Sequence, residues 1–355
     1  MNERHLEILG YDEWNRDTDA EHIADGFSPA RIIEVNKNSY IVSDGRHEMS
    51  AELTGKFMFN AESALDFPTV GDWVAIQSFD DDTYAIIHSV LPRKTLLKRK
   101  EPGKRIDFQL IASNIDFGLV VQSAERLNFN LLDRYFVMLH ETGIQPIAVF
   151  SKIDLLSPSE LSEAESKLSR LKNQYLLISN TTGEGMEELS RRLMPSKTYC
   201  LLGPSGAGKT SLLNSLLGTD MFKVSEVREK DGKGRHTTAR RQLIRLDSGA
   251  IFIDTPGMRE LGNFEIEDGI DQTFEEFSAY IPRCRFRDCT HAHEKGCAVI
   301  EAVERGEIEK SRYNNYLKLR RESEFYDMQY QEKRKKDKSF GKMMKDYKKH
   351  IKQNE

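Results

Sequence analysis

The features that would place this chain in a membrane are missing from its 355 residues. No apolar run approaches the roughly 18 to 20 residues that a membrane-spanning helix needs. The first residues also lack the basic and apolar pattern of a secretory signal, because positions 1–26 hold eight acidic side chains and two arginines. We therefore expect a cytoplasmic protein with no membrane partner.

Cysteine is scarce, and its distribution argues against a disulfide framework. Three of the four cysteines fall within fourteen residues, beside two histidines. In a cytoplasmic chain this clustering indicates a metal site rather than disulfide bonds. Cys200 stands apart in an apolar segment and is expected to be a small core residue.

The net charge of −5 conceals an uneven distribution. Residues 331–355 contain ten Lys/Arg and four Asp/Glu, a net charge of +6, which leaves −11 for the rest of the chain. A basic tail on an acidic body is typical of contact with a phosphate backbone. The alternative is a solvated helical tail that has no partner.

Residues from about 28 to 98 read as short strands separated by turn signals, without a helical stretch of any length. The expected strands are 30–35, 39–44, 55–59, 72–79 and 84–91. Several short strands within about 70 residues indicate a small all-β barrel, and an OB-fold is the first candidate. OB-folds commonly bind nucleic acid, and a barrel that only docks other proteins is the alternative.

Strands and helices alternate from about residue 106 to 265, which predicts an α/β domain with a largely parallel sheet. The expected strands are 116–124, 145–154, 174–180, 198–206, 241–247 and 250–257. The helices between them are expected at 130–143, 157–173, 183–194 and 208–218. The cysteine cluster follows, and then helical patterns at 298–306 and 307–330.

The stretch "GPSGAGKT" matches the phosphate-loop pattern G-x-x-x-x-G-K-[ST], with a strand before it and a helix after it. Its glycines let backbone N–H groups converge on phosphates, Lys209 reaches the β- and γ-phosphates, and the Thr210 hydroxyl coordinates Mg²⁺. We therefore predict a nucleotide site that includes Gly203, Pro204, Ser205, Gly206, Ala207, Gly208, Lys209, Thr210 and Ser211.

A second phosphate-side motif, "AIFIDTPG", ends an apolar strand at Asp254. Asp254 fits a water-mediated contact to Mg²⁺, and the backbone N–H of Gly257 fits the γ-phosphate. The polar segment "DGKGRHTTARRQ" between the two motifs is expected to be a mobile loop. Either Thr237 or Thr238 could complete the Mg²⁺ shell in the triphosphate state, and the sequence does not choose between them.

A guanine-reading motif is missing downstream of the phosphate loop, where a GTPase domain normally has it. The only Lys-x-Asp spacing there ends at Asp337, in a polar tail without a preceding strand. Upstream, "PIAVFSKID" ends a strand with Lys152 and Asp154 correctly spaced, and "LLISNTTGEG" ends another with Ser179 and Asn180. The carboxylate of Asp154 suits the N1 and N2 donors of guanine, and a backbone N–H at the second strand suits its O6.

The order of the motifs along the chain is therefore rotated relative to an ordinary GTPase domain, in which the phosphate loop precedes the guanine motif. Here the order is guanine motif, base-supporting loop, phosphate loop, switch loop and DTPG. Circular permutation leaves a packed sheet intact, because the termini of a domain lie on its surface and often near each other. An ATPase or kinase that uses the same phosphate loop is the alternative, and Asp154 argues against it.

The whole chain resembles the RsgA (YjeQ/YloQ) family of circularly permuted, ribosome-associated GTPases. The resemblance rests on "GDWV", "LPRKTLLKRK", "DRYFVMLHETGIQPIAVFSKIDLL", "GPSGAGKTSLLN", "GRHTT", "IDTPGMRE" and the Cys/His cluster. It implies an N-terminal OB-fold, a permuted GTPase domain and a C-terminal zinc domain. It also implies binding to the 30S subunit with its 16S rRNA, and ribosome-stimulated hydrolysis of GTP to GDP. We expect a monomer.

Two residues of the guanine site depart from the pattern of the family. Ser151 stands where Asn usually tethers the phosphate loop and contacts the base. A hydroxyl makes only part of that network, so we expect weaker nucleotide affinity with the guanine preference kept. Asn180 stands where Ala is commoner, and little change is expected because the backbone N–H makes that contact. The predicted guanine-binding residues are Ser151, Lys152, Ile153, Asp154, Ser179 and Asn180.

The stretch "CRFRDCTHAHEKGC" offers three thiolates and one imidazole, which complete a tetrahedral Zn²⁺ shell with no open position. The site is therefore expected to be structural. His293 is a possible substitute for one ligand, and the pattern of the family favours His291. The predicted zinc ligands are Cys284, Cys289, His291 and Cys297.

The glutamine that orients the attacking water in many GTPases is also missing, because Met258 follows DTPG. A thioether cannot hydrogen-bond to water as an amide does, so we expect slow intrinsic hydrolysis. Faster hydrolysis should require a group that is supplied when the partner docks. The catalytic candidate, which the family resemblance also suggests, is His236, and a solvated loop histidine is the alternative.

The predicted organisation is an acidic extension (1–27), an RNA-binding OB-fold (28–105), a permuted GTPase domain (106–268), a zinc-binding helical domain (269–330) and a basic tail (331–355). The expected function is a GTPase that assists late maturation of the 30S subunit. The rival hypothesis is a nucleotide-gated switch that binds another protein and for which hydrolysis is minor.

Overall fold

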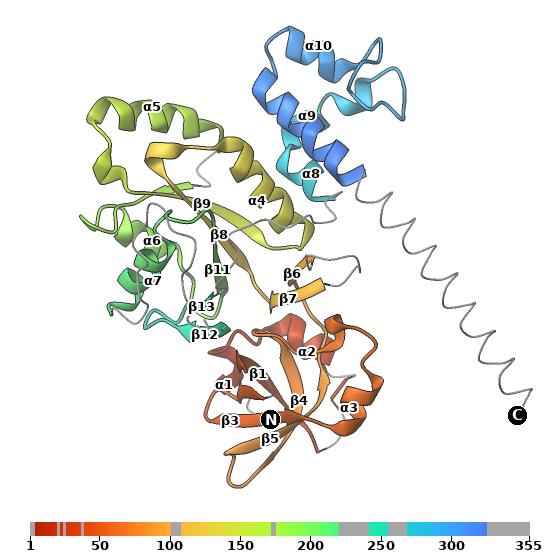
Figure 1. Cartoon of the computed structure of the whole chain (residues 1–355), viewed down its shortest axis with the longest axis vertical. Coiled ribbons are helices and arrows are strands. Elements are labelled where there is room, and N and C mark those ends of the chain that lie inside the picture. Colours follow the sequence, from red (N-terminus) through yellow and green to blue (C-terminus); the bar gives the residue numbers. More distant parts are fainter. Residues whose placement is uncertain are drawn as a thin grey trace, which may run out of the picture. The chain divides into compact units, whose positions relative to one another are not determined.

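The computed structural model describes residues 4–19, 22–23, 26–36, 39–100, 108–171, 175–219, 241–254 and 268–324 (Figure 1). The chain divides into two compact units. The first is Met1–Glu101 with Asp107–Gly262, and the second is Pro102–Ile106 with Asn263–Glu355. Among the helices within the described residues, none combines the length and the apolar character that a bilayer crossing requires.

Five strands near the N-terminus close into a barrel, which confirms the predicted OB-fold. Their order is β1-β2-β3-β5-β4, and β4 pairs back onto β1. The β3–β5 pair is parallel and the other pairs are antiparallel. The strands are β1 (Ser28–Val35), β2 (Tyr40–Ser43), β3 (Glu48–Leu53), β4 (Trp73–Phe79) and β5 (Tyr84–Val90). Alternate apolar side chains fill the interior, among them Ile32, Val42, Met49 and Ile87.

The strand predicted at 55–59 is wrong, because these residues form helix α3 (Gly55–Asn60). Thr54 caps the helix, with its Oγ1 accepting the N–H of Phe57 at 3.0 Å. The missed strand, β3, lies immediately before it in the polar stretch "EMSAEL", where only alternate side chains are buried. No residue of α3 is buried, and Phe59 is 90% exposed.

The acidic N-terminal segment packs against the barrel through helix α1 (Arg4–Glu7) and the turn that leads to helix α2 (Glu13–Asp19). Its apolar side chains form a cluster with residues of the barrel: Leu6, Leu9, Tyr11, Trp73, Ala75 and Leu91. The rings of Tyr11 and Trp73 meet edge to face at 4.7 Å. This segment is therefore part of the folded first unit.

A largely parallel sheet forms the rest of the first unit and confirms the predicted α/β domain. Strands β10, β9, β8, β11 and β13 are parallel in that order, and β12 is antiparallel to β13. The strands are β8 (Phe117–Ser123), β9 (Gln145–Ser151), β10 (Tyr175–Leu177), β11 (Thr198–Leu202), β12 (Arg241–Arg245) and β13 (Ile251–Asp254).

Helices cover both faces of this sheet. On one face, Leu189, Leu212 and Leu213 of the helices pack into a core with residues of β8, β9, β11 and β13. On the other, α4 comes so close to β8 that a side chain at Gly118 would meet Leu139 at 2.6 Å. The helices are α4 (Phe129–Glu141), α5 (Pro158–Leu168), α6 (Met186–Arg192) and α7 (Lys209–Leu217).

Barrel and sheet share one hydrogen-bonded ladder, because β12 pairs with β1 and joins them into an 11-stranded sheet. Glu34 lies opposite Gln242, and Val35 lies opposite Arg241. A separate two-stranded sheet, β6 (Leu96–Lys100) with β7 (Phe108–Ser113), was not predicted. Short 3-10 helices complete the unit: η1 (Ala64–Asp66), η2 (Ala124–Arg126), η3 (Ile153–Leu155) and η4 (Ser169–Leu171).

Arg31, on β1, is fully buried and ties the parts of the first unit together. Its guanidinium donates to oxygens of four separate segments: the carbonyls of Leu9, Gly71 (3.2 Å) and Asn114 (3.0 Å), and Thr198 Oγ1 (3.0 Å). Burial lowers the pKa of Arg31 to about 10, and the carboxylates of Asp116, Asp72 and Asp12 oppose that effect. A buried cation is tolerated here because several oxygens surround it.

The second unit is helical, as predicted. Its elements are α8 (Asp268–Thr273), α9 (Glu275–Ser278), η5 (Ile281–Arg283), α10 (Ala298–Glu304) and a helix over residues 310–324. The rings of Phe277 and Tyr316 stack at 4.5 Å, and Phe274 meets both edge to face. The Arg312 guanidinium lies 4.2 Å from the Phe274 ring.

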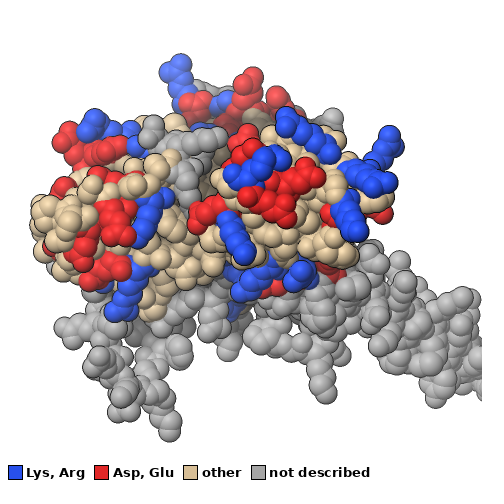
Figure 2. All heavy atoms as spheres, turned by 90° about the horizontal axis from the view of Figure 1, so that it is seen from above, with Lys and Arg blue, Asp and Glu red and all other residues tan. Residues whose placement is uncertain are grey.

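Acidic and basic side chains are interspersed on the face of the molecule in Figure 2. Within the part of the chain that the structure describes, that face therefore has no extended patch of purely positive or purely negative charge. The predicted basic tail, 331–355, lies outside the described residues.

Replacing Arg31 by methionine should destabilise the first unit strongly. The change leaves buried carbonyl oxygens without their donor, and we expect a loss of about 3 to 5 kcal/mol in the free energy of unfolding. Urea denaturation followed by tryptophan fluorescence measures it. The control is Arg46→Ala, at an exposed turn position, with an expected effect within about 0.5 kcal/mol. Equal effects in the two variants would contradict the role given to Arg31.

Candidate functional site

The predicted nucleotide residues follow strands that end at one edge of the sheet. Because β9, β10, β11 and β13 are parallel, their carboxyl ends share that edge. Ser151 ends β9, Ser179 follows β10, Gly203 follows β11 and Asp254 ends β13. The sheet therefore gathers motifs that are widely separated along the chain.

Glycine is required at both ends of the phosphate loop. Gly203 has a φ of 129°, and a Cβ there would lie 2.0 Å from the Val121 carbonyl oxygen. Gly208 has a φ of 85° and caps α7, so the loop runs directly into the N-terminus of a helix. Exposed backbone at such a helix start favours an anion.

Lys209, the first residue of α7, lies back over the loop. Its Nζ donates to the carbonyl oxygens of Gly203 and Pro204, each at 2.7 Å. Thr210 and Ser211 follow in the first turn of α7 and are half-buried, and Ser205 and Gly206 are exposed at the tip of the loop. The ammonium group is thus placed beside the groups expected to bind phosphate.

The guanine-motif serine contacts the phosphate loop directly. Ser151 is fully buried, and its hydroxyl donates to the Ala207 carbonyl oxygen at 2.6 Å, with a longer contact to the Gln122 carbonyl at 3.3 Å. Lys152, which follows, has a left-handed φ of 62° and caps η3. Ser151 therefore tethers the guanine motif to the phosphate loop. This is the part of the asparagine network that a hydroxyl was expected to make.

The Asp154 carboxylate is exposed to solvent and is oriented by the base-supporting loop. The Ser179 hydroxyl donates to Asp154 Oδ1 at 2.5 Å. The same Ser179 oxygen accepts the backbone N–H groups of Thr181 and Thr182, at 3.2 and 3.1 Å. Ile153, which precedes Asp154, is buried. The serine thus fixes both the loop and the direction of the carboxylate.

Tyr135 is a site residue that the sequence analysis missed. It lies on α4, is buried, and accepts a hydrogen bond from the backbone of Gly203 at the start of the phosphate loop. Burial raises the pKa of Tyr135 to about 12, against the effect of that hydrogen bond. Tyr135 lies within the helical pattern "DRYFVM", where a buried tyrosine reads as core, so no local signal indicated the contact.

Asp254 is the last described residue on the phosphate side of the site. Burial raises the pKa of its carboxyl group. A bound cation would favour the ionised form of this carboxyl group and so oppose the effect of burial. The other predicted residues on this side, His236, Thr237, Thr238, Gly257 and Met258, lie outside the described residues.

The predicted metal ligands converge in the second unit. The ligand atoms of Cys284, Cys289, His291 and Cys297 all lie within 4.8 Å of one another. His291 Nδ1 is 3.4 Å from Cys297 Sγ and 3.6 Å from Cys284 Sγ, and the two sulfurs are 3.9 Å apart. A tetrahedral centre with bonds of about 2.0 to 2.3 Å spaces its ligand atoms by about 3.3 to 3.8 Å. His293 is exposed and outside the cluster.

Without a cation, the surroundings of the cluster disfavour the charged thiolate form of its cysteines relative to the neutral thiol. Burial raises the pKa of the Cys297 thiol to about 12 and also raises the pKa of Cys289. Burial lowers the pKa of His291, which keeps the imidazole neutral and able to bind a metal. The chemistry of this donor set therefore fits a metal ion.

Glu294 holds the loop that carries His291. Its carboxylate accepts the backbone N–H groups of Thr290, Ala292 and His293, at 2.8, 3.0 and 3.1 Å. The Thr290 side chain is the largest of the contacts that lower the pKa of Glu294. On the other side, the Tyr313 hydroxyl donates to the His291 carbonyl at 2.6 Å. These bonds keep the ligand loop in place.

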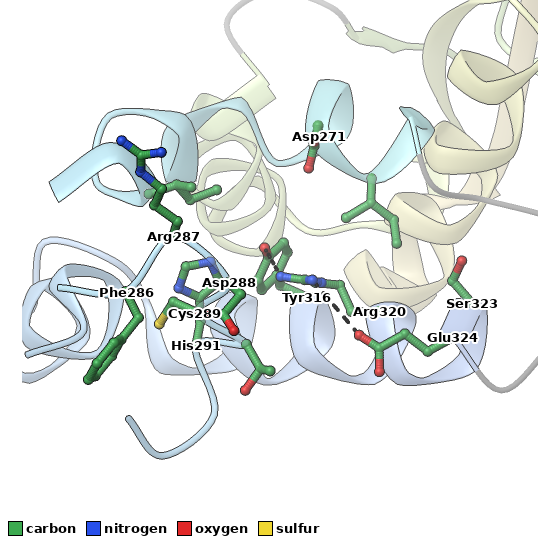
Figure 3. Close-up of a pocket in the computed structure, with 13 residues that line it drawn as sticks. Asp271, Phe286, Arg287, Asp288, Cys289, His291, Tyr316, Arg320, Ser323 and Glu324 are labelled. Atoms are coloured by element: carbon green, nitrogen blue, oxygen red, sulfur yellow. Dashed lines mark hydrogen bonds and ion pairs between the residues drawn. The ribbon is translucent and has the colours of Figure 1, made fainter. Parts of the chain in front are cut away.

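Beside the cluster lies a pocket of about 590 Å³, drawn in Figure 3. Cys289 and His291 line one part of it, and Tyr316, Arg320 and Glu324 line another. The Arg320 guanidinium donates to the Tyr316 hydroxyl at 3.2 Å and pairs with Glu324 at 3.8 Å. The basic group at this wall is therefore already engaged within its own helix.

Replacing His291 by alanine should release the metal, because the cluster then loses one of its four ligands. We expect about one metal equivalent per chain in the unaltered protein and a large loss in the variant, measured by mass spectrometry after dialysis. The matched control is His293→Ala, which should keep its metal. The ligand assignment fails if His293→Ala loses the metal and His291→Ala does not.

Comparison with known proteins places the chain in a family. A family model described as RsgA GTPase matches residues 90–264. The chain is 40% identical over 296 residues to "Small ribosomal subunit biogenesis GTPase RsgA 1" of Oceanobacillus iheyensis, covering 82% of this chain and 84% of that protein.

Two solved structures share the fold. YjeQ from Thermotoga maritima matches with a TM-score of 0.65 and 28% identity, over 84% of this chain and 98% of YjeQ. YloQ, described as a circularly permuted GTPase, matches with a TM-score of 0.64 and 24% identity, over 85% of this chain and 96% of YloQ. The rotated order of motifs agrees with the description of YloQ as a circularly permuted GTPase. The chain therefore belongs to the RsgA family of circularly permuted GTPases.

Proposed function

We propose that this chain is a GTPase that binds the small ribosomal subunit and assists its late maturation. Its family supports the role, because relatives are named small ribosomal subunit biogenesis GTPases. The observation that carries the nucleotide assignment is the Asp154 carboxylate, which Ser179 holds at the sheet edge that also bears the phosphate loop. A carboxylate there selects guanine, because adenine has no N–H donor at N1 or C2.

The nucleotide would be held at three places. The backbone N–H groups of residues 203–208 and the Lys209 ammonium suit the phosphates, and Gly257 suits the γ-phosphate. Asp154 suits the donors of the base, with Ser151, Lys152 and Ile153 shaping the loop beneath it and Asn180 near O6. Mg²⁺, which neutralises charge on the phosphates, would be held by Thr210, Asp254 and one of Thr237 and Thr238.

Hydrolysis is proposed to be slow without the partner. Met258 replaces the glutamine that orients water in many GTPases, and its thioether does not substitute for an amide. We assign the ordering of the water to His236, in the switch loop. Docking on the subunit would then supply or position the missing group, which is the usual route to faster phosphoryl transfer in slow GTPases.

The remaining parts have proposed roles of their own. The metal is Zn²⁺ and structural, since three thiolates and one imidazole leave no open position. The barrel and the basic tail contact 16S rRNA. We propose a monomer that works in the cytoplasm, where the subunit is assembled. The domain limits remain those proposed from the sequence: 1–27, 28–105, 106–268, 269–330 and 331–355.

Purified 30S subunits should raise the GTP turnover of this chain by at least about tenfold. His236→Ala should remove most of that stimulation while leaving GDP affinity within about twofold of the unaltered protein. Phosphate release under single-turnover conditions measures both. Lys209→Ala serves as the binding-defective control and excludes a contaminating GTPase. Unchanged turnover on addition of 30S subunits would instead favour the nucleotide-gated switch, for which hydrolysis is minor.

Removing residues 331–355 should weaken 30S binding and make it less sensitive to salt. Each phosphate contact that is lost lowers the slope of log affinity against log salt by about 0.7 to 0.9. A variant with the tail lysines and arginines changed to glutamine keeps the length of the tail and should behave like the truncation. An unchanged slope in both variants would mean that the tail is solvated and has no rRNA contact.

A further inference from the structure

Ser151 and Asn180 approach the same turn of the phosphate loop from two different strands. The Ser151 hydroxyl donates to the Ala207 carbonyl at 2.6 Å, and Asn180 Nδ2 donates to the next carbonyl, of Gly208, at 3.4 Å. A Cβ at Gly208 would lie 3.3 Å from Asn180 Nδ2 and 3.6 Å from Ser151 Oγ. The two side chains are therefore neighbours at the end of the loop where α7 begins.

Ser151 has no hydrogen-bond donor left for a ligand. A hydroxyl carries one proton, and the Ala207 carbonyl takes it at short distance. The side chain is fully buried and also contacts the Gln122 carbonyl at 3.3 Å, so it is held on the protein side of the site. Ser151 therefore acts as the tether of the loop.

Asn180, by contrast, has unused hydrogen-bonding capacity. A carboxamide offers two N–H donors and one carbonyl acceptor, and Gly208 engages one of the donors. The Asn180 Oδ1 atom is buried, and no donor reaches it within the described part of the chain. Oδ1 is an acceptor and requires a donor, so the group of Asn180 that remains for an acceptor on a ligand is the second N–H of Nδ2.

We infer that the side chain of Asn180 is a specificity-determining group for guanine, and that it supplies the amide which Ser151 lacks. The inference rests on the proposed function as a guanine-nucleotide-binding protein. Asp154 accounts for the N1 and N2 donors of the base, and the neighbouring acceptors O6 and N7 require N–H groups. The free N–H of Asn180 is such a group. In this chain the two tasks of one asparagine, tether and base contact, are divided between Ser151 and Asn180.

Asn180→Ala should weaken GDP binding by about tenfold, because an N–H donor to the base is lost. ADP binding should stay as weak as in the unaltered protein, since adenine has an amino group where guanine has O6. The GDP-to-ADP selectivity should therefore fall by the same factor, as measured by equilibrium titration with both nucleotides. The matched control is Thr181→Ala, at an exposed position of the same loop, which should leave both affinities unchanged.

A rescue experiment separates this role from general support of the loop. Adding Ser151→Asn to Asn180→Ala restores an amide beside the loop, in the space that the smaller alanine leaves. GDP affinity and selectivity should then return to within about threefold of the unaltered protein. A purely structural role of Asn180 would lower the GDP and ADP affinities together, and a second change in the core would not repair it.

The inference is overturned if Asn180→Ala binds GDP within twofold of the unaltered protein, or if it loses GDP and ADP affinity equally. Failure of the proposed function gives a different result. In that case the unaltered protein itself would not bind GDP, or would bind it as well after Lys209→Ala as before. Thermal unfolding of each variant, measured without nucleotide, verifies that the chain is folded.

Discussion

The buried guanidinium of Arg31 is the interaction on which the arrangement of the first unit depends. It bonds to oxygens from the N-terminal segment, the turn before β4, the connection between β7 and β8, and β11. A buried charge is stable only when several partners meet it, so these four segments must be in place together. Because β11 leads directly into the phosphate loop, the same bonds set the barrel beside the strand that carries the site.

The candidate site depends on where strands end and not on the order in which they are connected. β9 and β10 precede β11 in the chain, yet their carboxyl ends lie at the edge that β11 and β13 also reach. Ser151 therefore touches Ala207, 56 residues later, and Ser179 meets Asp154 across 25 residues. A permuted chain keeps these contacts, because packing and pairing in the sheet do not require that its connections follow one sequence order.

Residues with strict local requirements were predictable from the sequence. The glycines and lysine of the phosphate loop, the Lys152 and Asp154 spacing, and the ligand spacing around His291 each reflect geometry within a few residues. Helix α3 was mistaken for a strand because none of its residues is buried, so no pattern of burial marks it as a helix, and the Thr54 cap decides the local conformation. The roles of Arg31 and Tyr135 could not be predicted. Their partners are far away in sequence, up to 167 residues for Thr198, and no local pattern encodes such contacts.

The ladder between β1 and β12 has a consequence for how any large partner is recognised. Barrel and sheet edge belong to one continuous hydrogen-bonded sheet, so two surfaces on this unit are held at a fixed mutual spacing. A partner that touches both must present its own sites at that spacing, or it gains the affinity of only one. The first unit can thus discriminate between partners by the spacing of their contact sites, even where the chemistry of those sites is the same.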